Sequence, residues 1–196
     1  MHSYSTDSNE RIRIPFFLAG LGILFAWLLS WATKHYHISI PWWLDAPAAM
    51  GFYGLLYNFF NQTAWKWRWL HKANLIQTPN FSGIWSGNFY SSYDGHTEQK
   101  QATIEIRQTW SDICIVFKNG TSRSKSITAA ILTKSGEGIV LSYEYQNEPG
   151  YNTVSTMQIH KGFTRLILTT PKTFEGEYFT GRGRLSHGSM NFHRVS

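Results

Sequence analysis

Two long apolar runs stand out near the start of the chain. The first covers residues 14–33 and contains no charged residue, and the second covers residues 40–62 and contains one, Asp45. A helix needs about 20 apolar residues to cross the hydrocarbon core of a bilayer, because each residue adds about 1.5 Å. The pattern therefore predicts two transmembrane helices joined by a short polar connection.

The first run could also be a signal peptide, since Arg11 and Arg13 precede it. It is longer than the apolar part of a typical signal peptide, and no small-residue cleavage site follows it. We therefore interpret it as a span that stays in the chain. In the second run, Asp45 two residues before Pro47 is typical of a helix start, and a functional carboxylate inside the membrane is the alternative.

Tryptophan alternates with basic residues directly after the second run. Indole rings favour the membrane–water boundary, and cations there meet anionic headgroups. A nucleic-acid patch can have the same composition, but the position after a span favours lipid, and we expect no direct DNA or RNA binding. The predicted interface residues are Trp42, Trp43, Trp65, Lys66, Trp67, Arg68 and Trp69.

Basic residues are more frequent outside the polar connection than within it. Lys34 lies in the connection, whereas Arg11 and Arg13 precede the spans and Lys66, Arg68 and Lys72 follow them. The positive-inside rule then predicts that both termini are cytoplasmic. The expected organisation is a flexible tail (1–13), a two-helix membrane hairpin with a basic-aromatic juncture (14–72), a linker (73–79) and a cytoplasmic domain (80–196).

From residue 80 onward, short runs of β-forming residues alternate with turn signals such as Asp94-Gly95 and Asn119-Gly120. Short connections favour sequential antiparallel pairing, and closure into a barrel removes the sheet edges. We expect an all-β, up-and-down, lipocalin-like antiparallel barrel of eight or nine strands. The candidate strands are 81–91, 102–109, 113–118, 124–133, 138–146, 154–160, 164–170, 174–182 and 189–195.

Alternation assigns side chains to faces of these strands. Tyr143 and Tyr145 share a face of one strand, and Tyr178 and Thr180 share a face of another. If these faces point inward, the tyrosines either form an aromatic pocket with polar tips or pack the core.

The sequence contains none of the familiar catalytic motifs, and His35 with His37 is too weak a pattern for a metal site. We therefore predict a protein that is not an enzyme and has no cofactor or metal. A binding signal exists near the C-terminus, because arginine pairs with phosphate and aromatic rings stack on bases. The candidate ligand-binding residues are Trp85, Arg107, Tyr143, Tyr145, Arg165, Tyr178, Thr180, Arg182 and Arg184; on a strand, Arg182 and Arg184 would share one face.

The first strand reads Gly83-Ile-Trp-Ser-Gly87, which resembles the opening of lipocalin-like barrels, where the tryptophan closes one barrel end. Together with the two spans, the juncture and the ending Tyr178-Phe-Thr-Gly-Arg182 and Gly188-Ser-Met-Asn-Phe192, it resembles a bacterial family over residues 14–196. This family comprises the SMODS-associated, two-transmembrane, β-strand-rich effectors, also called transmembrane β-barrel CD-NTase-associated effectors, of CBASS antiphage systems.

The resemblance implies an antiviral effector of the bacterial inner membrane. A cognate CD-NTase would make a cyclic oligonucleotide, the barrel would bind it, and copies of the chain would form an oligomer that disrupts the membrane and arrests or kills the cell. The expected partners are thus the cyclic nucleotide, membrane lipid and further copies. The residues alone also fit a membrane-tethered, lipocalin-like binding protein for an apolar ligand, or a structural or partner-binding membrane protein.

Overall fold

The computed structural model describes residues 1–38, 41, 47–150, 158–182 and 184–195. The chain divides into two compact units, of which one contains residues 9–77 and the other contains residues 1–8 and 78–196. Asp45, predicted to cap the second span, and the predicted interface residues Trp42 and Trp43 lie outside the described residues.

The unit of residues 9–77 is helical. It contains α1 (Glu10–His35), α3 (Ala48–Gln62), the 3₁₀ turn η1 (Ala64–Lys66) and the short helix α4 (Arg68–Lys72). Among the described residues, α1 is the helix that is long and apolar enough to cross a membrane. Helix α3 covers the C-terminal part of the predicted second span, at a length of about 22 Å.

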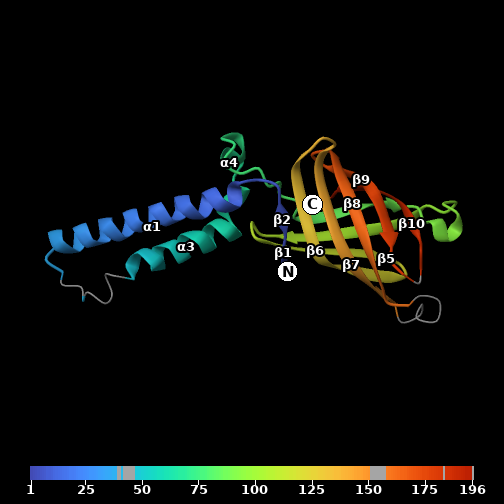
Figure 1. Cartoon of the computed structure of the whole chain (residues 1–196), viewed down its shortest axis with the longest axis horizontal. Coiled ribbons are helices and arrows are strands. Elements are labelled where there is room, and N and C mark those ends of the chain that lie inside the picture. Colours follow the sequence, from blue (N-terminus) through green and yellow to red (C-terminus); the bar gives the residue numbers. More distant parts are fainter. Residues whose placement is uncertain (39–40, 42–46, 151–157, 183, 196) are drawn as a thin grey trace. The chain divides into compact units, whose positions relative to one another are not determined.

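Helices α1 and α3 lie side by side (Figure 1) and approach closely at a glycine. A Cβ atom at Gly22 would lie 3.0 Å from the carbonyl oxygen of Ala49 and 3.1 Å from the backbone nitrogen of Tyr53. Small residues permit such close packing of helix backbones. Gly51 and Gly54 differ, because a Cβ atom at either position would meet no described atom within 4 Å.

The described juncture residues have two kinds of surroundings. Lys66 and Arg68 are exposed, and Trp67 and Trp69 are 40% and 57% exposed. Trp65 is fully buried, and its carbonyl oxygen lies 2.9 Å from Nε2 of His71. The role of these residues at a membrane interface stays a prediction.

The second unit is a closed antiparallel barrel, as the alternation predicted (Figure 1). Each strand pairs with the next in sequence, and β10 returns to pair with β3. The barrel strands are β3 (Gly83–Phe89), β4 (Lys100–Gln108), β5 (Asp112–Asn119), β6 (Ser122–Ser135), β7 (Gly138–Pro149), β8 (His160–Thr170), β9 (Thr173–Thr180) and β10 (His187–Arg194).

One expected strand, 154–160, is not described over residues 154–157, and its last residue, His160, opens β8. Lys161 and Gly162 lie between two of the expected strands, but both residues continue β8. A Cβ atom at Gly162 would lie 2.3 Å from the hydroxyl oxygen of Tyr145. The glycine therefore provides space for a neighbouring side chain rather than a turn.

Of the expected flexible tail, residues 1–8 belong to the barrel unit, and residues 10–13 form the start of α1. Strand β5 pairs with β6 over only a short stretch, from Val116–Lys125 to Lys118–Arg123. Beyond this stretch, β1 (His2–Ser3) pairs with β5 and β2 (Ser5–Thr6) pairs in parallel with β6. The first residues of the chain thus fill a gap in the barrel wall.

Side-chain contacts hold these N-terminal strands in place. Tyr4 is buried in the core, and its hydroxyl donates to the carbonyl oxygen of Trp110 at 2.7 Å. The carboxylate of Asp7 accepts hydrogen bonds from the backbone of Thr133 and Lys134 at 2.9 Å and 2.8 Å. These bonds replace the ladder that β5 and β6 do not form with each other.

One end of the barrel is filled with apolar side chains. Trp85 is 1% exposed, its ring centroid lies 4.2 Å from that of Phe174, and its Nε1 donates to the carbonyl oxygen of Phe81 at 3.0 Å. The guanidinium of Arg194 lies over the Trp85 ring at 5.6 Å and donates to the carbonyl oxygen of Asn80. Trp85 therefore closes this end, which we call the closed end.

Candidate ligand-binding site

The opposite, open end of the barrel holds a cavity of about 270 Å³. Its depth can be followed along the β7–β8 register, where every second pair points inward. From the mouth inward, these pairs are Asn147–His160, Tyr145–Gly162, Tyr143–Thr164 and Leu141–Leu166, of which the last belongs to the apolar core.

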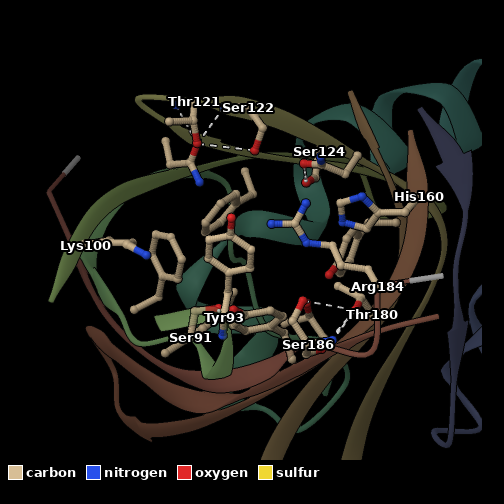
Figure 2. A pocket seen from close by; sticks show the side chains of 18 of the residues that line it. Ser91, Tyr93, Lys100, Thr121, Ser122, Ser124, His160, Thr180, Arg184 and Ser186 are labelled. Carbon is tan, nitrogen blue, oxygen red and sulfur yellow. Dashed lines mark hydrogen bonds between the residues drawn. The ribbon is translucent and has the colours of Figure 1, made fainter. Parts of the chain in front are cut away.

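Three basic side chains, Lys100, His160 and Arg184, line the cavity, and none of its described lining residues carries a carboxylate. Figure 2 shows Lys100 on one side of the cavity and His160 with Arg184 on the other. Such a lining favours an anionic ligand, because the positive charges of Lys100 and Arg184 lower the energy of a negative charge placed between them, and His160 adds a third charge when it is protonated.

The loops at the mouth hold two of these cations. Lys100 forms an ion pair with Asp94, which raises the pKa of Lys100 and lowers that of Asp94, mainly through their hydrogen bond. The guanidinium of Arg184 stacks over the ring of Tyr93, with its Cζ atom 5.4 Å from the centroid. This contact joins the β3–β4 loop to the β9–β10 loop.

The β9–β10 loop is fixed at its base. The Thr180 hydroxyl donates to the carbonyl oxygen of Ser186 at 3.0 Å and accepts from the Ser186 backbone nitrogen at 2.8 Å. In addition, the backbone nitrogen of Gly181 donates to the carbonyl oxygen of Lys161 at 2.8 Å. Thr180 therefore positions the loop that carries Arg184, and its own hydroxyl is already engaged.

Aromatic side chains supply much of the remaining surface. Burial raises the pKa of Tyr143 to about 12 and also raises the pKa values of Tyr145 and Tyr178, so all three phenols are neutral at pH 7. They can stack on flat groups and offer hydroxyls for hydrogen bonds. The aromatic lining residues are Phe89, Tyr93, Phe117, Tyr143, Tyr145 and Tyr178.

Of the residues predicted from sequence to bind ligand, five line this cavity: Tyr143, Tyr145, Tyr178, Thr180 and Arg184. Trp85 lies outside it because it closes the other end of the barrel. Arg107 and Arg165 lie outside it because they face the outer surface, where they pair with Glu105 and Glu137.

The sequence predicted that Arg182 and Arg184 share one face of a strand, but the structure does not place them on a strand. Strand β9 ends at Thr180, and Arg182 lies exposed in the loop that follows. The bonds between Thr180 and Ser186 end the strand two residues before the predicted position. The two arginines therefore have different surroundings, although they are only two residues apart.

Among the lining residues that the sequence did not predict, four supply polar or charged groups that matter below: Tyr93, Lys100, His160 and Thr164. Alternation carried a signal for three of them. Lys100 has the same parity as the inward-facing Ile104 and Ile106, and His160 and Thr164 have the parity of Leu166. Tyr93 lies in a loop, where no such periodicity applies.

Comparison with known proteins agrees with this architecture. The family model described as "Cap15, cyclic dinucleotide receptor domain" matches residues 76–194, and that described as "Cap15, TM helices" matches residues 12–66. A solved structure of a redesigned β-barrel aligns with 59% of this chain and with 91% of the designed chain, at 14% sequence identity and a TM-score of 0.30.

Two curated relatives have the same name, CD-NTase-associated protein 15. The protein from Yersinia aleksiciae is 33% identical over 189 residues, which cover 91% of this chain and 86% of that protein. The protein from Staphylococcus schleiferi is 30% identical over 122 residues, which cover 62% of this chain and 64% of that protein. The family resemblance seen in the sequence is thus confirmed, and the chain belongs to the Cap15 family.

Proposed function

We propose that this chain is a CBASS effector whose barrel binds a cyclic dinucleotide in the open-end cavity. The observation that carries the proposal is the lining of that cavity: three basic side chains and six aromatic ones, with no carboxylate among its described residues. A cyclic dinucleotide has two phosphate charges and two flat bases, which this combination suits. The cavity also lies within the region that matches the receptor-domain model.

Lys100 and Arg184 are the expected phosphate contacts. Arg184 can bind a phosphate through two parallel N–H donors, whereas Lys100 acts as a compact charge and would exchange Asp94 for the ligand. An apolar ligand would desolvate Arg184, which forms no ion pair with a described residue, and leave it without a counter-charge, which is costly. The cavity therefore favours a nucleotide over the apolar ligand of a lipocalin-like carrier.

The path of the chain supports a membrane hairpin with both termini in the cytoplasm. Residues 2–6 and the barrel strands belong to one folded unit, which supports placing residues 2–6 and the barrel on the same side of the membrane. An even number of crossings by the segment 9–77 fits this placement, and α1 with α3 is the expected hairpin. The basic residues that flank the spans favour the cytoplasm of the bacterial inner membrane.

Binding would act on the membrane through association of copies. A ligand made by a cognate CD-NTase shifts the population toward the oligomer only if it binds that state more tightly. Gly51 and Gly54, which leave open space beside α3, offer a surface for contact between hairpins in lipid. The assembled hairpins would then disrupt the inner membrane. Neither matching family model describes an enzyme, and the proposal needs no catalysis.

The first test measures binding of a panel of cyclic dinucleotides to the full chain in detergent. One member should raise the melting temperature and bind measurably. Arg184→Gln should weaken that binding at least about tenfold, since a hydrogen bond to a charged group contributes about 1.5–3 kcal/mol. Arg182→Gln removes the same charge two residues away, outside the cavity, and should change affinity less than about twofold. Equal losses in the two variants would contradict a site in the cavity.

The second test addresses the membrane. Chains reconstituted in dye-loaded liposomes should release the dye when the bound nucleotide is added, and light scattering in detergent should report a larger particle. Arg184→Gln should abolish both effects at the same ligand concentration. Tight binding with unchanged particle size and no release would contradict the membrane-disruption part of the proposal and leave the receptor part intact.

A further inference from the structure

The floor of the cavity is formed by a pair of hydroxyl groups. Tyr143 and Thr164 are direct partners in the β7–β8 register, and the next inward pair, Leu141 and Leu166, is apolar. The mouth pair, Asn147–His160, lies four residues away, or about 13 Å along the strand. On these two strands, Tyr143 and Thr164 are thus the deepest polar pair.

Both side chains are buried, and the hydroxyl of each has the other as its nearest polar partner, an interaction that slightly offsets the effect of burial on the Tyr143 pKa. Tyr143 is 2% exposed and Thr164 is 1% exposed, and neither hydroxyl oxygen has a hydrogen-bond partner of regular geometry among the described residues. A buried polar group that lacks a partner costs about 1–3 kcal/mol, so folded proteins rarely keep one without a reason.

Other hydroxyls around the same cavity are engaged with the protein. The Ser124 hydroxyl donates to Oδ1 of Asn147 at 2.8 Å, and the Ser91 hydroxyl accepts from the backbone nitrogen of Tyr93 at 3.2 Å. The Thr180 hydroxyl is bonded to Ser186. The floor therefore differs from the wall, because its hydrogen-bonding capacity remains for a molecule that enters the cavity.

We propose that Tyr143 and Thr164 bind the hydrogen-bonding edge of one base of the cyclic dinucleotide and so select among bases. Each hydroxyl can donate or accept, and a base edge presents donors and acceptors side by side. The base enters edge-first, beneath the level where Arg184 and Lys100 meet the phosphates. This inference rests on the proposed receptor function and adds to it a location for base recognition.

The test compares dissociation constants of a panel that differs in its bases, with the full chain in detergent. Tyr143→Phe and Thr164→Val retain shape and remove one hydroxyl each. Each substitution should lower the affinity for the preferred ligand about five- to tenfold, because it leaves one polar group of the ligand without a hydrogen-bond partner. Each should change the affinity for an analogue that lacks the polar substituents of the base less than about twofold. Tyr90→Phe and Thr103→Val, at residues that do not line the cavity, are the matched controls.

Three outcomes can be distinguished. A loss that depends on the substituents of the base supports the inference. Wild-type affinity and wild-type selectivity in both variants would overturn it, since the hydroxyls would then bind water, and receptor function would stand. If the wild type binds no member of the panel, the receptor proposal fails, and the inference fails with it. The melting temperature of the ligand-free variants should change little, because the one interaction removed is the weak contact between the two hydroxyls.

Discussion

Along β7, the inward-facing side chains change from Leu141 near the closed end of the barrel to Tyr143, Tyr145 and Asn147 toward the open end. Both halves follow the same alternation, so geometry alone does not distinguish them. At the closed end, Trp85 and its neighbours fill the interior. At the open end, the side chains leave a cavity and expose cations to it. The packed closed end therefore contributes to stability, and the open end offers the cavity in which we propose that ligand binds.

The largest expected effect is the loss of the plug. Trp85→Ala should lower the free energy of unfolding by about 3–5 kcal/mol, because it removes a buried ring and leaves a void beside Phe174. Thermal melting of the full chain in detergent measures this, and the melting temperature should fall by about 10 °C.

The separation of the two ends of the barrel also predicts how Trp85→Ala affects ligand binding. Below its melting temperature, Trp85→Ala should retain nucleotide affinity within about twofold, since Trp85 does not line the cavity. Ile84→Ala is the matched control on the same strand. Because Ile84 is 47% exposed, this substitution should lower the free energy of unfolding by about 0.5 kcal/mol or less. A large loss of affinity in well-folded Trp85→Ala would show that the two ends are coupled.

A smaller loss is expected at the gap that the N-terminal strands fill. Tyr4→Ala removes a buried ring and its bond to the carbonyl of Trp110, which should cost about 2–4 kcal/mol. Tyr4→Phe retains the ring and should lower the free energy of unfolding by about 1 kcal/mol. Thermal melting distinguishes the two, and equal effects of both variants would contradict the packing role of the ring.

Sequence patterns predicted the closed end better than the open end. Gly83-Ile-Trp-Ser-Gly87 indicated a plug, and Trp85 is buried at the closed end. An apolar side chain in an alternating pattern indicates a buried position, because removal from water stabilises apolar groups. The residue type of a cation gives no such signal, since Lys100 lines the cavity while Arg107 on the same strand faces outward. Only their positions in the alternation of the strand distinguish the two.

Strand ends and short strands were the other source of error. Arg182 was misassigned because the Thr180–Ser186 bonds that end β9 depend on contacts that no periodicity records. Strands β1 and β2 have two residues each, which is too few to show an alternation. Their partners lie more than a hundred residues away, so the gap in the wall could not be foreseen locally.

The smallest predicted effect concerns pH at the mouth of the cavity. Burial lowers the pKa of His160 below its ordinary value of 6.5, and the nearby Arg184 lowers it further, so the ring is neutral at pH 7.5. When the pH falls through this lowered value, the ring gains a positive charge at the rim of the cavity. Nucleotide affinity should then rise about two- to fivefold between pH 7.5 and 5.5, which is typical of a partly solvated charge pair.

The stability of the ligand-free chain should change in the opposite direction. The unfolded chain protonates His160 near pH 6.5, whereas the folded chain does so only at lower pH, so the free energy of unfolding falls as the pH decreases below about 6.5. His160→Gln should remove this histidine's contribution to both trends, while His193→Gln, outside the cavity, should retain it. Titration calorimetry and melting curves at both pH values measure the two effects. An affinity that rises equally in His160→Gln would mean that another group near the phosphates titrates, and that the open end senses pH through a different residue.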